Sequence, residues 1–570
     1  MRPFAWNPPL VAALVVLSIG GCSGDESSSS SSASASSSSS GGSTGSASGG
    51  STGSESGGST SGGSGGESTG STAGTSTGEV TSTSGSTTGG PPPLEVWDAH
   101  RGVLHVHSPF SHDACDGEGL MGGVPNEGCV ADLRAAICAA GLDFVNLTDH
   151  PAYMKDYPFE ALLLLRGGDQ VIVEDGMPVA NRIKCPNDHV ALVTVGYEAT
   201  HTLPLGLHHH VAAEFYGSLV DADAVEVGKA LVAALQAGGA VVGIAHSEEA
   251  DLSAGRIVEV GLDAMEWYNP HGNFKTALGG DSIAGDPAVV LELIQGLLPF
   301  MAGSKSGAHP DLVYLRLLPK WPVEGFAKWR EVLRSRPITG LFGSDVHQNV
   351  KVDPICEQKD PVLKAACLAA ANAVLPPALA GLVSGGTLTM ADGERLDSYL
   401  RIFRWLENRV LLAPGEVLTM AALQDGLREG RSFGVFSVFG DPSGFAFVGD
   451  GEGGSTVQLG GSVAGPTTLH VQAPVRPEPL GAGGPSWEAS EGEKATIRAV
   501  LVHTDAGGSA EVATIDSLGE RLDFAAEAAG AYHVEVWVRP GHLKKALGSE
   551  DALAAVEYLW VITNPIYVAG

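Results

Sequence analysis

Residues 341–347 read Leu-Phe-Gly-Ser-Asp-Val-His, a short apolar run that ends in two residue types able to hold a divalent metal. Six further apolar runs end in the same way: 104–107 (LHVH), 144–150 (FVNLTDH), 193–198 (VTVGYE), 207–210 (LHHH), 241–246 (VVGIAH) and 264–267 (AMEW). Strand-like runs that alternate with helical patterns predict parallel strands with helices outside. Because the carboxyl ends of barrel strands gather at one face, we expect the seven ends to converge.

Helical patterns lie between the runs and after them. Residues 130–140 carry apolar side chains at helical spacing and stop at Gly141, and residues 224–237 stop at Gly238. Similar patterns are found at residues 324–334, 362–374, 399–406 and 417–428. Residues 151–188 form a long insertion after the second run, for which we expect a lid or a substrate wall.

The spacing of the candidate ligands is informative. His105 and His107 are two residues apart on a predicted strand, so both side chains should face the barrel mouth, and Asp345 and His347 repeat that spacing. Clustered imidazole and carboxylate ligands allow a protein to generate hydroxide near neutral pH. The pattern therefore favours hydrolysis by a metal-bound hydroxide, with no protein nucleophile.

Five motifs in order resemble the polymerase and histidinol phosphatase (PHP) superfamily. They are residues 105–108 (HVHS), 147–150 (LTDH), 196–198 (GYE), 245–246 (AH) and 343–347 (GSDVH). Residues 430–433 (GRSF) and 562–566 (ITNPI) are similar to the secreted carbaryl-hydrolase-like (CehA/McbA) branch. The resemblance implies an α/β fold, a distorted (β/α)7 barrel, that holds two or three divalent ions such as zinc, manganese or iron.

The resemblance also implies three groups of ligands. The first metal would lie among His105, His107, Glu198 and Asp345, with Glu198 bridging to the second; His246 and a histidine of the fourth strand would complete the second; Asp113, His150 and His347 would hold the third.

Two ligand assignments stay open at this point. Either His112 or Asp113 is the ligand after the first strand, and we favour Asp113 because a carboxylate suits a hard cation. His208 and His210 share one face of the fourth predicted strand, and we favour His208.

Three further residues are expected near the metals. Asp149 is expected to orient a ligand or to accept a ring N–H. Glu266 and His271 follow the sixth run and are candidates for an acid or base in the pocket.

The N-terminal segment resembles a bacterial lipoprotein signal. Arg2 precedes a short apolar stretch at residues 9–19, and small residues lead into Cys22, the expected lipidation site. Residues 23–90 are almost only Ser, Gly and Thr, so we expect a flexible linker with a span of roughly 45 Å. We therefore expect an exported protein of the bacterial envelope, at the outer membrane or cell surface, attached to membrane only by lipid.

The sequence predicts five parts. They are the signal (1–22), the linker (23–93), the metal-binding barrel (94–395), a helical connector (396–440) and an antiparallel β-sandwich (441–570). The last part contains short β-branched runs between Gly-rich turns and no ligand cluster. Besides Cys22 there are six cysteines, for which we expect disulfides; Cys356 and Cys367 are close enough for a local one.

Composition limits the partners. Asp and Glu number 65 against 33 Lys and Arg, a formal net charge of −32. So acidic a chain does not favour binding of nucleic acid, and we expect a small-molecule substrate. The sequence thus predicts a hydrolase that cleaves a phosphoester or an ester, amide or carbamate bond. The alternative is a lipid-anchored surface binding module with the metal-stabilised barrel as its scaffold.

Overall fold

The structure is a computed structural model, and its described part begins at residue 94. It describes residues 94–217, 219, 225–249, 252–270, 295–301, 307–316, 324–352, 361–374, 386–481, 484–485 and 494–570. The predicted signal with Cys22, the linker, His271 and Cys356 lie outside these residues. Residues 94–570 belong to one compact unit. Within the described part, no helix combines the length and the apolar character needed to cross a membrane.

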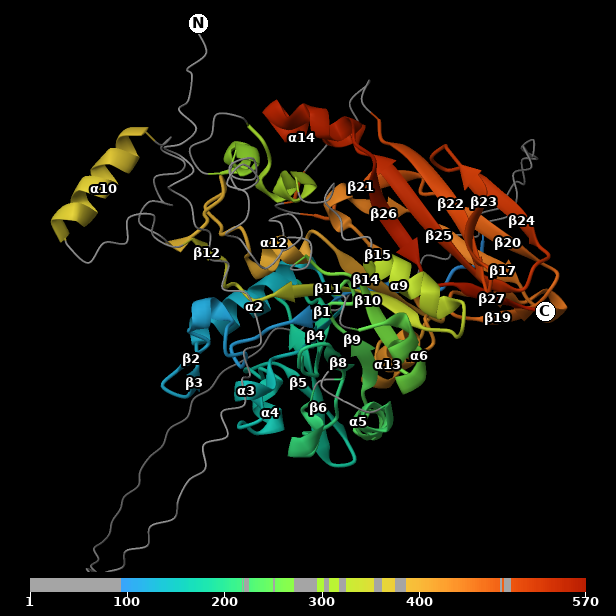
Figure 1. The fold of residues 1–570 in the computed structure, drawn as a ribbon, viewed down its shortest axis with the longest axis horizontal. Coiled ribbons are helices and arrows are strands. Elements are labelled where there is room, and N and C mark those ends of the chain that lie inside the picture. The colour runs from blue at the N-terminus through green and yellow to red at the C-terminus, as the bar shows by residue number, and fades with distance from the viewer. Residues whose placement is uncertain are drawn as a thin grey trace, which may run out of the picture. The chain divides into compact units, whose positions relative to one another are not determined.

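Five strands run parallel in the order β7–β4–β1–β11–β10 (Figure 1). Their bounds are β1 (Asp98–Val106), β4 (Phe144–Leu147), β7 (Val190–Val195), β10 (Ala264–Tyr268) and β11 (Thr339–Val346). Strand β9 (Val241–Ile244) lies beside β10, since the Asp263 N–H donates to the Val242 carbonyl at 2.9 Å. These six strands match six of the seven predicted runs. Their carboxyl ends carry the candidate ligands.

The seventh run, residues 207–210, is not a strand. The strand at this position is β8 (Thr202–Leu205), and it pairs antiparallel with β9, with Thr202 opposite Ile244 and Leu205 opposite Val241. The chain therefore enters β8 beside the carboxyl end of β9, where the ligands lie, and leaves β8 beside the amino end of β9. The expectation of an all-parallel set of strands is wrong at this position.

The architecture is mixed α/β with a large sheet. Fifteen of the described strands form one hydrogen-bonded sheet, and its ladder does not close into a barrel over the residues described. The insertion at residues 151–188 contributes β5 (Gln170–Glu174) and β6 (Met177–Lys184), which extend this sheet by pairing antiparallel at the edge of β7. Part of the insertion therefore forms the edge of the large sheet.

The predicted helices form, and their ends follow the sequence signals. Helix α2 (Glu127–Ala140) begins after Asn126, whose side chain accepts the N–H groups of Gly128 and Cys129, and ends at Gly141 in the left-handed conformation. Further helices are α5 (Val225–Ala237), α6 (Ala254–Val260), α9 (Glu324–Leu333), α10 (Pro361–Val374), α12 (Tyr399–Phe403) and α13 (Met420–Arg428).

Two disulfides join elements of the first part of the fold. Cys115 is bonded to Cys129 on α2, and Cys138 at the other end of α2 is bonded to Cys185. The expectation of disulfides is confirmed for these four cysteines. They fasten α2 to the segment after β1 and to the segment after β6.

The C-terminal strands continue the same sheet. The segment predicted as a helical connector also contains β14 (Glu407–Leu412) and β15 (Ser432–Val435). β14 pairs with β1, β15 with β14, and β26 (Tyr558–Thr563) with β15, all antiparallel. Beyond β26 lie β25 (Gly530–Arg539), β22 (Thr496–Asp505), β23 (Gly508–Ile515), β27 (Ile566–Ala569) and β19 (Ser462–Ala464). A second sheet holds β18 (Thr456–Val457), β17 (Ala446–Asp450), β20 (Thr467–Gln472) and β24 (Arg521–Ala526).

A buried ion pair fixes β14 against β1. The Glu407 side chain is fully buried, and its carboxylate accepts Arg101 of β1 at 2.7 Å and Arg409 at 2.6 Å. Burial alone would raise the pKa of Glu407, but Arg101 and Arg409 outweigh it and lower the pKa to about 2. The ionised carboxylate therefore stabilises the folded state at neutral pH.

We predict that Glu407→Gln lowers the free energy of unfolding by about 3 kcal/mol at pH 7, because the part-buried Arg101 guanidinium loses the carboxylate that it contacts and Arg409 is left with Asp441. The folded-state pKa lies below the ordinary 4.5, so this stabilisation is present above pH 4.5 and is lost as the pH falls toward 2. Urea unfolding of the wild type and the variant at pH 7 and near pH 2 measures this loss of stability, with the exposed Glu331→Gln as control. Equal losses at both pH values would contradict the assignment.

Candidate metal centre

Two imidazole nitrogens at the end of β1 are aimed at the same carboxylates. His105 and His107 are fully buried, and the Nε2 atom of each has no hydrogen-bond partner. Nε2 of His105 lies 3.2 Å from Oε2 of Glu198 and 3.3 Å from Oδ1 of Asp345. Nε2 of His107 lies 3.2 and 3.4 Å from the same two oxygens. Buried ring nitrogens left in this state cost free energy unless a further partner joins them.

These spacings fit a cation. Four ligand atoms placed tetrahedrally about 2.1 Å from a common ion lie about 3.4 Å from one another. The four nitrogen–oxygen distances from His105 and His107 to Glu198 and Asp345, 3.2 to 3.4 Å, match that edge length. The residues present therefore fit a divalent metal, with the mixed imidazole and carboxylate ligands that zinc, manganese and iron accept.

Glu198 and Asp345 also reach His246. Nε2 of His246 lies 2.9 Å from the second oxygen of Glu198 and 3.6 Å from Oδ2 of Asp345. His105, Glu198, His246 and Asp345 thus each offer one atom to a group in which all atoms lie within 4.8 Å of one another. Since each carboxylate has one oxygen toward His105 and one toward His246, the pair can bridge two ions.

A further group forms beside the first. His107, Asp113, His150 and His347 offer atoms that lie within 4.8 Å of one another. Nε2 of His347 is 3.3 Å from Oδ2 of Asp113, and Nε2 of His150 is 3.7 Å from the same oxygen. Nδ1 of His347 donates to the Asp345 carbonyl at 2.9 Å, which leaves Nε2 as the basic nitrogen that faces Asp113. Eight of the nine predicted ligands therefore meet in two adjoining groups.

The backbone is strained at three of these ligands. His105, His246 and Asp345 have φ values of 58°, 50° and 49°, in the left-handed region that non-glycine residues avoid. The register of β1 shifts between Leu104 and Val106 against β11 and between Val103 and Val106 against β4, so both irregularities include His105. Positive φ angles at non-glycine residues cost roughly 1–3 kcal/mol each. Bulges re-aim side chains, and both features gather at functional sites.

The charges of the cluster depend on one another. Burial opposes ionisation of Glu198 and Asp345, yet the imidazoles, with His105 foremost, hold the pKa of both carboxyls well below the usual range. Burial also opposes protonation of His105, but Asp345, Glu266 and Glu198 raise its pKa well above the ordinary value. Without a cation, protons on His105 and His246, whose pKa values are both raised, supply the positive charge that the carboxylates need. A divalent ion would replace those protons, so its binding would release them.

Glu266 orients two ligand-bearing strand ends. Its carboxylate is buried; Oε1 accepts Nδ1–H of His105 at 2.6 Å, and Oε2 accepts the backbone N–H of His246 at 2.8 Å. This bond fixes the tautomer of His105 with Nε2 free for a cation. A Cβ at Gly343 would lie 1.7 Å from Oε1, so only glycine admits the Glu266 carboxylate here. Glu266 therefore supports ligands and is too buried for the predicted acid or base role in an open pocket.

Asp149 has the supporting role that the sequence predicts, but through the backbone. Its oxygens accept the N–H of Ser108 at 2.5 Å and the Ser108 hydroxyl at 2.7 Å. Ser108 directly follows His107, whose carbonyl accepts the Tyr399 hydroxyl at 2.7 Å. Asp149 and Tyr399 thus hold the turn that follows β1, and no ring N–H of the described residues donates to Asp149.

Three predicted candidates lie outside both groups. His208 has its ring against Gly239 and contacts Glu174 at 3.4 Å and Gln424 at 3.5 Å. Both ring nitrogens of His210 are engaged, one with the Tyr216 hydroxyl and one with the Tyr157 carbonyl. The side chain of His112 is 45% exposed and lies at the rim, 3.9 Å from Asp113. His271 is outside the described residues.

The antiparallel direction of β8 explains the position of His208. Gly239, which the His208 ring contacts, precedes β9, whereas His246 follows β9. The histidine at the ligand end is His201, just before β8; it is buried, its ring centroid lies 6.4 Å from that of His246, and Nε2 is 3.6 Å from Glu249. The sequence signal that could have identified His201 is its position three residues after Glu198. Glu248, 3.6 Å from Nδ1 of His246, was also missed.

Comparison with known proteins adds little. No family model and no curated protein matches the chain. A similar solved structure is the crystal structure of a two-domain protein that contains a predicted PHP-like metal-dependent phosphoesterase from Bacteroides vulgatus. It is 11% identical, with a TM-score of 0.27, and the match covers 83% of this chain and 100% of that chain.

We predict that Glu266→Gln weakens divalent-metal binding by about 10- to 100-fold, because an amide cannot accept from both His105 and the His246 backbone. Titration of the metal-free protein with zinc or cobalt, followed by calorimetry or the cobalt absorption spectrum, measures the loss. Gly343→Ala should weaken binding in the same way by displacing Glu266. The exposed Glu259→Gln is the control, and wild-type affinity in both test variants would remove Glu266 from this role.

Proposed function

We propose that this chain is a metal-dependent hydrolase that acts on a small molecule through two or three divalent ions such as zinc, manganese or iron. The observation that carries the proposal is the pair of buried, unpartnered Nε2 atoms of His105 and His107, both within 3.4 Å of Glu198 and Asp345. His246 adjoins this group, and Asp113, His150 and His347 form the neighbouring one with His107.

The chemistry follows from the donor set. When bound, adjacent divalent ions lower the pKa of a coordinated water and polarise a substrate oxygen, which suits cleavage of a phosphoester or of an ester, amide or carbamate bond. Residues of this chain would position those ions: Glu266 holds His105, and Asp149 holds the turn after His107. Strain at three ligand positions supports a functional reading, because a scaffold alone gains nothing from it.

The finer features of the fold belong to the same proposal. We infer that the strands around the two groups correspond to a distorted (β/α)7 barrel of the PHP type, and that the C-terminal strands correspond to a β-sandwich. Ordered motifs from His105 to His347 support the first inference, and the pairing of short antiparallel strands supports the second.

We predict that Asp345→Asn lowers the metal content of the purified protein by at least one ion and lowers hydrolysis about 100-fold or more, because Asp345 contacts both His105 and His246. Metal analysis and a panel of chromogenic phosphate monoester, phosphodiester, acyl ester and carbamate substrates measure both effects. His105→Ala should behave alike, and the exposed Asp516→Asn should match the wild type. Unchanged metal content in both site variants would refute the proposed centre.

We also propose that the protein is exported and attached to the bacterial envelope by a lipid on Cys22. We expect Cys22→Ser to move the protein from the membrane fraction to the soluble fraction, since a lipid anchor supplies the apolar attachment that the described helices do not. Fractionation of cells that express either form measures this. Membrane retention of the variant would require another anchor.

A further inference from the structure

Asp113 is the one candidate metal ligand of the two groups that lies in a loop well beyond the end of its strand. β1 ends at Val106, and no helix or strand contains Asp113. Its Oδ1 accepts the Ser111 hydroxyl at 2.9 Å, and its Oδ2 faces Nε2 of His347 at 3.3 Å. Because no strand pairing sets the position of Asp113, the contacts that anchor the loop must set it.

The loop is anchored directly after this ligand. Cys115 is bonded to Cys129 of α2, and its N–H donates to the His347 carbonyl at 2.8 Å. The next N–H, of Asp116, donates to the Gln348 carbonyl at 2.9 Å. Cys115 and Asp116 have φ values of 54° and 63°. Non-glycine residues keep this left-handed conformation only where the surroundings impose it, so the segment depends on its anchors.

The disulfide also touches the group that holds a second ligand. Tyr399 is fully buried, and its hydroxyl lies 4.0 Å from Sγ of Cys115 and 3.7 Å from Sγ of Cys129. The same hydroxyl donates to the His107 carbonyl at 2.7 Å. A rearrangement of the two sulfurs would therefore disturb the segment of Asp113 and the hydroxyl that holds His107.

A second anchor keeps the loop attached to the protein. Arg395 donates to both carboxylate oxygens of Asp116, at 2.9 and 3.0 Å. The disulfide acts one residue nearer to Asp113 than this ion pair does. If the disulfide opens, we therefore expect a displaced ligand in a loop that stays folded.

The charge of the second group depends on this ligand. Asp113 is its single carboxylate, and its other members are the imidazoles of His107, His150 and His347. The first group instead has two carboxylates, Glu198 and Asp345. A divalent ion in the second group would thus take negative charge from one ligand only, so displacement of Asp113 should weaken that ion selectively.

We propose that the Cys115–Cys129 disulfide positions Asp113 for metal binding, so that the second group binds its ion tightly only while this pair is oxidised. The inference rests on the proposed metal-dependent function and adds a redox dependence to one of its ions. A dithiol would reverse the oxidised state. It gives two electrons and two protons, the S–S bond breaks, both cysteines become thiols, and the dithiol becomes a disulfide.

The cysteine pair is largely buried, so substitution tests the proposal directly. In the full-length, metal-free protein, Cys115→Ala combined with Cys129→Ala should weaken one zinc ion by about 10- to 100-fold and leave the others unchanged. Calorimetry with zinc and metal analysis after gel filtration measure the affinities and the number of ions.

The second disulfide supplies the matched control. Cys138→Ala combined with Cys185→Ala removes the bond at the other end of α2, away from the ligand loop. That bond spans 47 residues, whereas Cys115–Cys129 spans 14. A general loss of stability would therefore be larger in the control. We expect wild-type metal binding there.

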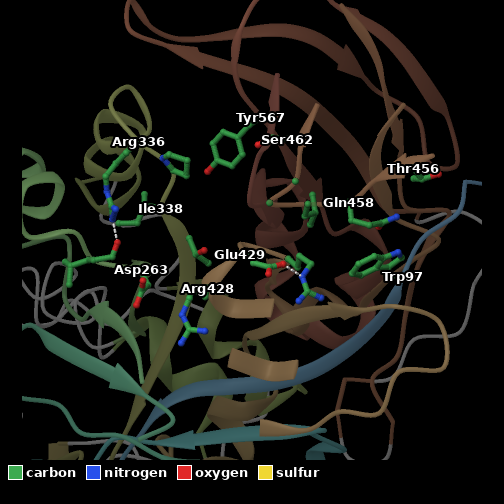
Figure 2. Close-up of a pocket in the computed structure, with 17 residues that line it drawn as sticks. Trp97, Asp263, Arg336, Ile338, Arg428, Glu429, Thr456, Gln458, Ser462 and Tyr567 are labelled. Carbon is green, nitrogen blue, oxygen red and sulfur yellow. Dashed lines mark hydrogen bonds and ion pairs between the residues drawn. The ribbon is translucent and has the colours of Figure 1, made fainter. Parts of the chain in front are cut away.

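A double-mutant comparison ties the effect to the ligand. In a protein that already carries Asp113→Asn, removal of the Cys115–Cys129 bond should cause no further loss of zinc affinity, because both changes act on the same ion. Glu429→Gln controls for the loss of one carboxylate from an acidic protein. Glu429 is exposed and lies in the wall of a 520 Å³ cavity with Asp263 and Ile338, at the amino ends of β10 and β11 (Figure 2).

Reduction provides a second test that does not depend on folding of the cysteine variant. The folded control protein, which lacks the Cys138–Cys185 bond, is treated with dithiothreitol; the reagent is then removed without air, and thiols are counted. Titration with manganese follows, because thiolates favour softer metals. We expect weaker binding of one ion, restored when the protein is oxidised again.

Three results would each overturn the proposal. They are equal affinity for every ion in the folded variant or the reduced protein, an equal loss in the Cys138–Cys185 control, and an additive loss in the Asp113→Asn background. Each of them leaves the proposed hydrolase centre standing, because the wild type still binds metal. A wild type that binds neither zinc nor manganese would instead refute both the centre and this inference.

Discussion

The centre of this molecule depends on mutual compensation among buried charges. Glu198 and Asp345 are buried carboxylates, and each lies within 3.4 Å of the ring nitrogens of His105 and His107. Neither the acids nor the imidazoles would be tolerated alone at this depth. Because the four side chains come from three different strands, the sheet must hold β1, β7 and β11 in register for the charges to meet. The strained backbone at His105 and Asp345 is the cost of that arrangement.

Much of the site could be predicted from the sequence, because strand ends are marked by apolar runs and ligands sit directly after them. His105, His107, Glu198, His246 and Asp345 were found in this way. What failed was strand direction. Residues 202–205 are too short to show whether they run parallel or antiparallel, and only the pairing with β9 decides it. Because β8 runs antiparallel to β9, His201, which precedes β8, lies near the metal ligands. His208, which follows β8, lies far from them.

The C-terminal half shows a similar limit. Residues 407–412 are buried on both faces, so they lack the alternation that identifies a strand, and the sequence predicts a helical connector there. In the structure this segment is β14, pinned by Arg101 to Glu407 and paired with β1. The sheet of the metal centre therefore continues through β14, β15 and β26 into the C-terminal strands. A substitution in the C-terminal strands can therefore affect His105 through the continuous strand pairing from β26 to β1.

The close approach of Gly343 to Glu266 has an evolutionary consequence. Oε1 of Glu266 occupies the place where any other residue at position 343 would put its Cβ. The two positions cannot drift separately: a side chain at 343 requires a shorter residue at 266, and His105 then loses its partner at Nδ1. In an alignment of homologues, glycine at 343 and glutamate at 266 should therefore be kept or lost together. Lineages that lost both would mark the point at which selection for metal binding ended.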